Sequence, residues 1–164
     1  MTLAVDLARA VNCTDGEAKP CGTCQQCQRI DGGNHADVQV VQVEAEGQSG
    51  RLRAEITIDQ VRTIEKASTL QPYEGSYRVF IIDGAERLNL YAATALLKTV
   101  EEPPEQVIIL LLTSNEEAIP ITLRSRCQRL ELRPLSLEAV AGILISERGL
   151  SHKEAQLLGR LSGG

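Results

Sequence analysis

The sequence predicts an α/β fold in which a mostly parallel sheet is flanked by helices. Apolar strand patterns alternate with amphipathic helix patterns through most of the chain, which is typical of parallel sheets. The run at 79–83 is apolar up to its last residue, Asp83. Such a run places a carboxylate at the C-terminal edge of a buried parallel strand, where open α/β sheets bind ligands. Hydrophobic residues make up 43% of the chain and aromatic residues only 2%, so Leu, Ile, Val and Ala must build the core.

The first half of the chain is expected to hold two helices and one strand around a cysteine-rich segment. The expected elements are a helix at 3–11, a cysteine-rich segment at 12–33, a strand at 38–43, a charged loop at 44–55 and a helix at 57–70. Apolar residues of the first helix lie close to helical spacing. Thr57 and Gln60 form a capping-box pattern, which predicts where the second helix begins.

The second half of the chain continues the alternation of strands and helices. The expected elements are a strand at 78–82, a helix at 90–102, a strand at 107–112, a short helix at 120–125 and a strand at 128–132. Asn89 suits the cap of the first of these helices, and Pro103 ends it.

The pattern changes after Pro134 to two helices that begin at serines. Ser136 opens the first of them and Gly149 closes it, and Ser151 opens the second with a capping box. We therefore expect two domains: a core at 1–133, which includes the cysteine-rich segment, and the start of a small helical domain at 134–164.

Four of the five cysteines, Cys13, Cys21, Cys24 and Cys27, fall within one short segment. Four thiolates this close can surround one tetrahedral Zn²⁺, and two-residue gaps let neighbouring thiolates point at the same ion. Such an all-cysteine site is structural, because no position stays open for water. The alternative is a set of reduced thiols or disulfides. Cys127 lies apart and is expected to be a small buried residue.

Polar side chains follow two of the expected strands and are candidates for a nucleotide site. Asp83 and Glu86 end one strand, and Thr113 follows the next. The acids are candidates for facing Mg²⁺, or for satisfying free N–H groups at the start of a helix. Thr113 is a candidate for contacting a phosphate, or for capping a turn. The phosphate cradle that such a site needs, G-x-x-x-x-G-K-[ST], occurs nowhere in the 164 residues.

Arg126 stands at a helix end just before an expected strand. Arginine suits a finger that reaches into a neighbour's phosphate site, because its planar fork is always charged. Such fingers contribute roughly 10³–10⁵ in rate in other phosphoryl-transfer systems. The alternative is a cation near a helix C-terminus, for which Arg124 and Arg129 are equally suitable.

The formal net charge of the chain is −5 and its pI about 5.1. This balance excludes a chain-wide electrostatic attraction to nucleic acid, so any DNA contact must be local or come from partners. No apolar run is long enough to span a bilayer and no signal peptide opens the sequence, so we expect a soluble, cytoplasmic protein.

Four sequence motifs resemble those of one protein family. The run ALLKTVEEPP at 95–104 resembles the A-L-L-K-T-[LV]-E-E-P-P motif of the clamp-loader subunits of bacterial DNA polymerase III. Residues 125–127 resemble the S-R-C motif of these subunits, the cysteine-rich segment resembles their zinc module, and residues 34–37 resemble their H-P-D element. The resemblance runs in the expected order through residues 1–164. It implies an AAA+ domain with a P-loop-type parallel sheet, a zinc-binding insertion and the start of a helical lid.

The family contains an ATP-hydrolysing gamma/tau type and a delta-prime type of subunit. The gamma/tau pattern continues its aspartate directly with glutamate, the general base, whereas Gly84 follows Asp83 here. Residues 56–62 also resemble the delta-prime type more closely. In the family register, Met1 falls just after the phosphate loop, so the first strand and the phosphate loop are expected to be missing from this sequence.

The resemblance implies a non-hydrolysing stator that helps gamma/tau and delta subunits to load the sliding clamp onto primed DNA. Arg126 would act in trans on ATP and Mg²⁺ bound by the neighbouring subunit, Asp83, Glu86 and Thr113 would be remnants of a nucleotide site, and the four clustered cysteines would hold zinc. Two alternatives remain open. One is a gamma/tau-type ATPase that uses Glu86 as its base, and the other is a free-standing zinc module that binds DNA, which the acidic balance and the lack of aromatic residues disfavour.

Overall fold

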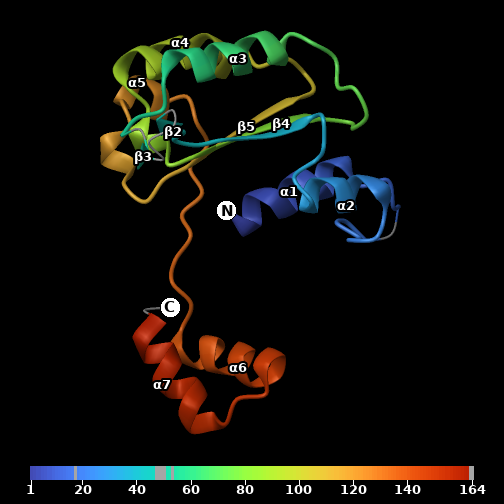
Figure 1. Cartoon of the computed structure of the whole chain (residues 1–164), viewed down its shortest axis with the longest axis vertical. Helices are drawn as coiled ribbons and strands as arrows, with labels where there is room; N and C mark the ends of the chain where they lie inside the picture. Colours follow the sequence, from blue (N-terminus) through green and yellow to red (C-terminus); the bar gives the residue numbers. More distant parts are fainter. Residues whose placement is uncertain (17, 47–50, 53, 163–164) are drawn as a thin grey trace. The chain divides into compact units, whose positions relative to one another are not determined.

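The computed structural model describes residues 1–16, 18–46, 51–52 and 54–162 (Figure 1). The chain forms two compact units, Met1–Cys127 and Gln128–Gly164. The loop expected at 44–55 lies partly outside the described residues, as do Gly163 and Gly164 of the expected helical domain. The described part of that loop includes a short antiparallel pair, β2 (Ala45–Glu46) and β3 (Arg51–Leu52).

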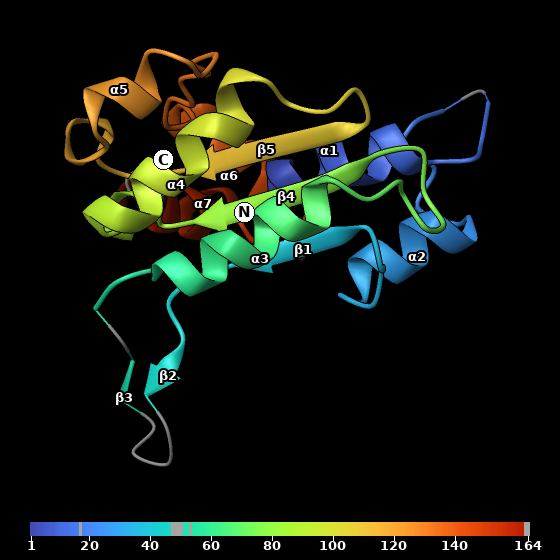
Figure 2. The same ribbon diagram turned by 90° about the horizontal axis from the view of Figure 1, so that it is seen from above.

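The first unit is built on a parallel sheet with the strand order β1-β4-β5, which Figure 2 shows from above. Its strands are β1 (Val38–Val41), β4 (Arg78–Asp83) and β5 (Val107–Leu112). The central strand β4 is fully buried at four of its six positions, whereas every residue of β5 is only half-buried. Three predicted strands are therefore confirmed, and the α/β class with them.

Helices cover both faces of this sheet, because its strands are apolar on both sides. Phe80 and Ile82 point to the face covered by α3 (Ile58–Ser68) and α4 (Leu90–Glu101). Val79 and Ile81 point to the opposite face, covered by α1 (Thr2–Asn12), against which α2 (Gln25–Asp31) packs. Figure 1 shows α3 and α4 together on one side of the sheet and α1 on the other.

The predicted caps are observed at the starts of two helices. The backbone N–H of Thr57 donates to Oε1 of Gln60 at 3.0 Å, which completes the capping box of α3. The side chain of Asn89 accepts from the N–H of Ala92 at 2.9 Å at the start of α4. Three short helices complete the unit: η2 (Ala85–Arg87), η3 (Glu116–Ala118) and α5 (Ile121–Arg124).

The strand predicted at 128–132 does not form. A strand needs a neighbour that pairs with its N–H and C=O groups, and no described strand lies beside this segment. Leu130 and Leu132, which suggested the strand, are 75% and 68% exposed. The prediction of this strand is therefore wrong, because the partner that such a strand requires is not among the described elements.

The second unit holds two helices, α6 (Leu137–Arg148) and α7 (His152–Ser162), which pack against each other. Ser136 caps α6 by accepting from the N–H of Ala139 at 3.2 Å, and Ser151 pairs with Glu154 at the start of α7. Gly159 allows the close approach, since a Cβ there would come within 2.7 Å of Leu137. None of the described helices is long and apolar enough to cross a membrane.

Candidate functional site

The four clustered cysteines meet in space. The sulfur atoms of Cys13, Cys21, Cys24 and Cys27 all lie within 4.8 Å of one another. Cys13 comes from the end of α1, and Cys27 from within α2, whose N-cap is Cys24. A tetrahedral Zn²⁺ with bonds of about 2.3 Å separates its sulfurs by about 3.8 Å, and the Cys13 and Cys24 sulfurs lie 3.9 Å apart. The donor set and its spacing therefore fit one metal ion.

Backbone N–H groups point at two of these sulfurs. The N–H of Cys24 donates to Sγ of Cys21 at 3.3 Å, and the N–H of Cys27 donates to Sγ of Cys24 at 3.5 Å. The bond from Cys27 is the main reason why the pKa of the Cys24 thiol falls to about 5, whereas burial raises the pKa of Cys27 to about 12. Donors that favour a thiolate also favour binding of a cation.

The C-terminal edge of the sheet carries the predicted acids. Asp83 ends β4, and its strand neighbour in register is Leu112, the last residue of β5. Gly84 follows with φ +79°, in the left-handed region that favours glycine. Its N–H donates to the C=O of Leu112 at 3.1 Å, so the backbone turns sharply here and leads into η2.

Glu86 reaches across this edge to the end of β5. Its Oε1 accepts from the hydroxyl of Ser114 at 3.1 Å. Burial acts to raise the pKa of Glu86, but hydrogen bonds from its own N–H, from Thr113 and from Ser114 outweigh it and lower the pKa. The other oxygen, Oε2, is buried and accepts no hydrogen bond from the described residues. An ionised carboxylate with one unsatisfied oxygen therefore lies at the strand ends.

Thr113 caps the turn that follows β5, as one of the two interpretations of the sequence expected. Its hydroxyl oxygen accepts from the N–H of Asn115 at 3.0 Å. Asp83, Glu86 and Thr113 thus share the C-terminal edge of β4 and β5, as the register of parallel strands requires.

Arg126 follows α5 and contacts the end of α4. Its Nε donates to Oε1 of Glu101 at 2.5 Å, and its Nη1 donates to the C=O of Thr122 at 2.6 Å. The pair is accessible, with 39% of the arginine side chain and 46% of the glutamate side chain exposed. No local pattern predicts this pair, because 25 residues separate its members.

The two other arginines of this region have their own acidic partners. Arg124 donates to the C=O of Glu116 at 3.4 Å and lies 3.8 Å from its carboxylate. Arg129, in the second unit, lies 3.7 Å from the carboxylate of Glu131.

The buried carboxylate of Asp37 lies at the N-terminal edge of the sheet, directly before β1, and binds several donors there. The motif at 34–37 did not predict these contacts. The oxygens of Asp37 accept from the N–H groups of Tyr73, Glu74 and Gly75 at 2.8–2.9 Å and from Nη2 of Arg78 at 2.9 Å. Burial acts to raise the pKa of Asp37, but these donors together lower it. The signal available in the sequence was an acid directly before an apolar strand. The structure shows that this acid is fully buried, and a buried charge requires such a network of partners.

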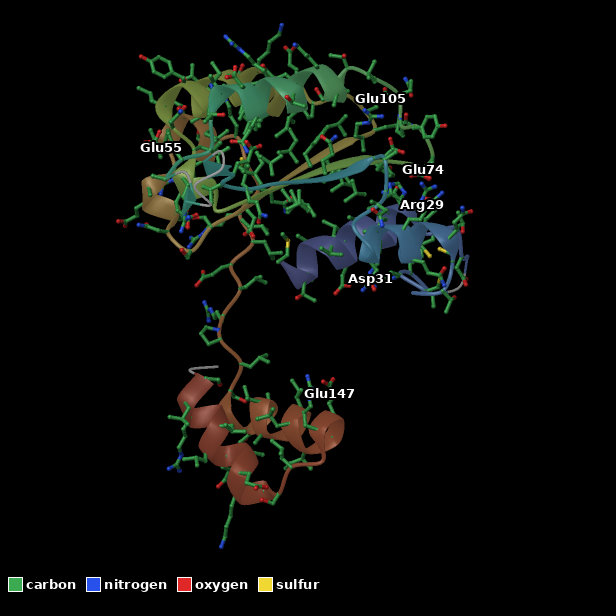
Figure 3. The ribbon with its side chains drawn as sticks, viewed as in Figure 1. Arg29, Asp31, Glu55, Glu74, Glu105 and Glu147 are labelled. Carbon is green, nitrogen blue, oxygen red and sulfur yellow. The ribbon has the colours of Figure 1, made fainter. Side chains whose placement is uncertain are left out.

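His35 joins this network to the cysteine cluster. Its Nδ1 accepts from the N–H of Asp37 at 3.1 Å, so its Nε2 carries the proton and donates to Oε1 of Gln26 at 2.6 Å. Gln26 belongs to α2 and directly precedes Cys27. Arg29 of the same helix pairs with Glu74, and Figure 3 shows these two side chains side by side. The module at 12–33 is therefore tied to the sheet by polar contacts.

Comparison with known proteins finds one family. A family model described as "DNA polymerase III, delta subunit" matches residues 1–136. The DNA polymerase III subunit tau of Salmonella typhimurium is 34% identical over 164 residues, which cover 96% of this chain and 24% of the relative. The subunit delta' of Bacillus subtilis is 31% identical over 159 residues, which cover 97% of this chain and 46% of the relative. The chain thus spans between a quarter and a half of the length of these relatives.

A solved structure supports the fold. A DNA polymerase III gamma subunit-related protein from Thermotoga maritima superposes with a TM-score of 0.52 at 30% sequence identity. The match covers 76% of this chain and 44% of that protein. Relatives with tau names and with delta' names match at similar identity, so similarity alone does not divide the two types of subunit.

Proposed function

Since the chain belongs to the family of DNA polymerase III clamp-loader subunits, we propose that it is a delta-prime-type subunit that does not hydrolyse ATP. The observation that carries this proposal is Gly84. It stands directly after Asp83, where the gamma/tau pattern has its catalytic glutamate, and its φ of +79° is one that residues with side chains rarely adopt. Both the missing carboxylate and the backbone conformation oppose a general base at this position.

In this proposal the subunit is a stator. It helps to hold gamma/tau and delta subunits in the assembly that places the sliding clamp on primed DNA during replication, and it works in the cytoplasm. Contacts with DNA come from the assembly, since the chain has a net charge of −5. Asp83, Glu86 and Thr113 are then remnants of a nucleotide site.

Arg126 is proposed to complete the active site of the neighbouring subunit. Its exposed guanidinium would contact the phosphates of ATP bound with Mg²⁺ by that neighbour, and would stabilise the charge that develops in the transition state. Arg124 and Arg129 are the alternatives that the sequence leaves open, and each has an acidic partner, as Arg126 does.

The four clustered cysteines are proposed to hold one structural Zn²⁺. Their sulfurs fit a single ion, and zinc with four thiolates keeps no open position for substrate. The ion would supply folding energy to the module at 12–33, and not chemistry.

The test is DNA-stimulated ATP hydrolysis by the chain alone and by the loader assembled with gamma/tau and delta subunits. We expect no turnover by the chain alone, and a rate in the assembly that falls by roughly 10³-fold on Arg126→Ala, the low end of what fingers contribute. An assembly whose ATPase rate is unchanged by Arg126→Ala contradicts the proposed role of Arg126 as an arginine finger. ATP turnover by the chain alone contradicts the proposal that the subunit is a stator.

Glu86 favours a second candidate, a gamma/tau-type ATPase. Its lowered pKa and its unsatisfied Oε2 place an ionised carboxylate at the strand ends, where a base would act on water. ATP turnover by the chain alone that Glu86→Gln abolishes would support this candidate and would overturn the first.

A further inference from the structure

The guanidinium of Arg126 is held between the ends of two helices. Nε donates to Glu101, the last residue of α4, at 2.5 Å. Nη1 donates to the C=O of Thr122 in α5 at 2.6 Å, and lies 3.4 Å from the hydroxyl of Ser125. The three contacts are made by Nε and Nη1, and together they restrain the guanidinium.

One nitrogen of the Arg126 guanidinium, Nη2, stays available for a further hydrogen bond. Among the contacts that the described residues make with Arg126, none uses Nη2. A guanidinium binds a phosphate through two adjacent N–H groups, and Nη2 can supply one or both of them. The side chain is 39% exposed, and a phosphate that binds through Nη2 need not displace the C=O of Thr122 from Nη1.

The position of Glu101 is not explained by its own helix. An anion at a helix C-terminus faces the negative end of the macrodipole and is unfavourable there. Its contact with Arg126 compensates for this. Glu102, the next residue, is also exposed, but the contacts of Arg126 do not include it. The contact is therefore specific to one of two adjacent glutamates.

We propose that Glu101 is a positioning residue that holds the guanidinium of Arg126 with its Nη2 end directed outward, ready for a nucleotide phosphate on the adjacent subunit. This inference rests on the proposed role of Arg126. Without Glu101 the arginine side chain would sample other rotamers, and fewer molecules would present the fork correctly when the transition state forms. An exposed ion pair shifts the equilibrium between side-chain conformations by up to about five-fold. We therefore expect an effect of this size on the rate when Glu101 is removed.

The experiment measures kcat and KM for ATP in the loader assembled with gamma/tau and delta subunits, on primed DNA. The variants are Glu101→Ala, Glu101→Gln, Arg126→Ala, and Glu101→Ala combined with Arg126→Ala. Glu102→Ala is the matched control. We expect Glu101→Ala to lower kcat about five-fold with KM unchanged, because positioning matters most in the transition state. Glu101→Gln should retain most of the rate, since its amide oxygen still accepts from Nε.

The double variant separates positioning from a structural role. If Glu101 acts through Arg126, Glu101→Ala has no further effect once Arg126 is alanine. An equal loss in both backgrounds, or a loss matched by Glu102→Ala, overturns the proposal. If Glu101→Ala has the wild-type kcat while Arg126→Ala has a lowered kcat, the positioning role of Glu101 is overturned and the finger role of Arg126 is retained. A wild-type kcat for Arg126→Ala overturns the finger and with it this inference.

Discussion

At the scale of single residues, the positive φ of Gly84 determines which side chains can follow Asp83 at the end of β4. A residue with a Cβ pays a backbone penalty of about 1 kcal/mol at its φ of +79°. The space around it is ordinary, since an added Cβ would first meet the Arg87 side chain at 3.6 Å. Backbone conformation, and not crowding, is therefore what disfavours a glutamate at this position.

We expect Gly84→Glu to lower the free energy of unfolding by about 1 kcal/mol and to leave the chain without ATP turnover. Urea unfolding and a steady-state ATPase assay measure the two effects. Gly84→Ala is the matched control, because it carries the same backbone penalty without a carboxylate. Turnover gained by the glutamate variant but not by the alanine variant would contradict the proposal that the chain is a stator.

His35 gives the fold a dependence on pH. Burial lowers its pKa in the folded chain more than Glu74 and Asp37 raise it. As the pH falls through the ordinary value of about 6.5, the unfolded chain takes up the proton first, and stability is lost until the folded pKa is passed. Asp37 adds a second loss at lower pH, because its pKa is also lowered and its stabilisation disappears only when that carboxyl is protonated.

Unfolding free energies measured between pH 8 and pH 5 test this. We expect the wild-type chain to lose stability below about pH 6.5, and His35→Gln to be less stable at pH 8 but flatter across the range. His152→Gln, at an exposed residue of α7, is the matched control for replacing a histidine. A slope that His35→Gln leaves unchanged would show that another group titrates.

At the scale of elements, the proposed zinc site makes the stability of the cysteine module at 12–33 depend on a ligand. Removing zinc with a chelator, or substituting Cys24→Ser, should increase hydrogen exchange in α2 and leave the central strand β4 protected. Cys127→Ser is the control, because that cysteine lies outside the cluster. Metal analysis of the wild-type chain should find one zinc, and a chain purified without chelator that contains none would contradict the site.

The elements that could be predicted are those whose signal is local. The strands β4 and β5 are short apolar runs, and α3 and α4 begin at caps that the sequence displays. The helix α2 was not predicted, because two cysteines occupy its first turn and its cap. Cys24 caps it through sulfur, which accepts from the N–H of Cys27, and this is not one of the usual capping side chains.

In the candidate site, too, the contacts between residues close in sequence or in strand register could be predicted, and the distant contacts could not. The strand-end acids and the cysteine cluster could be predicted, because register and short spacing bring those residues together. The contacts of Arg126 with Glu101 and of Asp37 with the N–H of Glu74 join residues 25 and 37 positions apart. Such contacts depend on how helices and loops pack, which no local pattern encodes.

At the scale of the whole molecule, the two outer strands of the sheet differ in kind. The strand β1 has four residues, and its exposed Gln39 interrupts the apolar run. The strand β5 has six residues, all apolar and all half-buried, and among the described elements it pairs on one side only. An apolar, unpaired strand edge is a template for pairing with another chain.

We therefore expect the isolated chain to self-associate as its concentration rises, and Val107→Lys to reduce this association. Val107 begins β5 and is half-buried against the core, and the charge of a lysine there disfavours a second strand at this edge. Sedimentation velocity over a range of concentrations measures the effect. Gln39→Lys, which adds the same charge to β1, is the control, and an equal reduction by both variants would indicate a general effect of charge.

The contact of Asn12 with the 71–77 loop also restricts the order in which the chain can fold. The side chain of Asn12 accepts from the N–H of Tyr77, 65 residues further along, and Gly75 lies so close that a Cβ there would come within 2.4 Å of the same oxygen. Closing so long a loop costs entropy before any contact compensates for it. We therefore expect this bond to form late in folding, after β1 and β4 have paired, and the polar contacts that anchor the cysteine module to be among the first lost on unfolding.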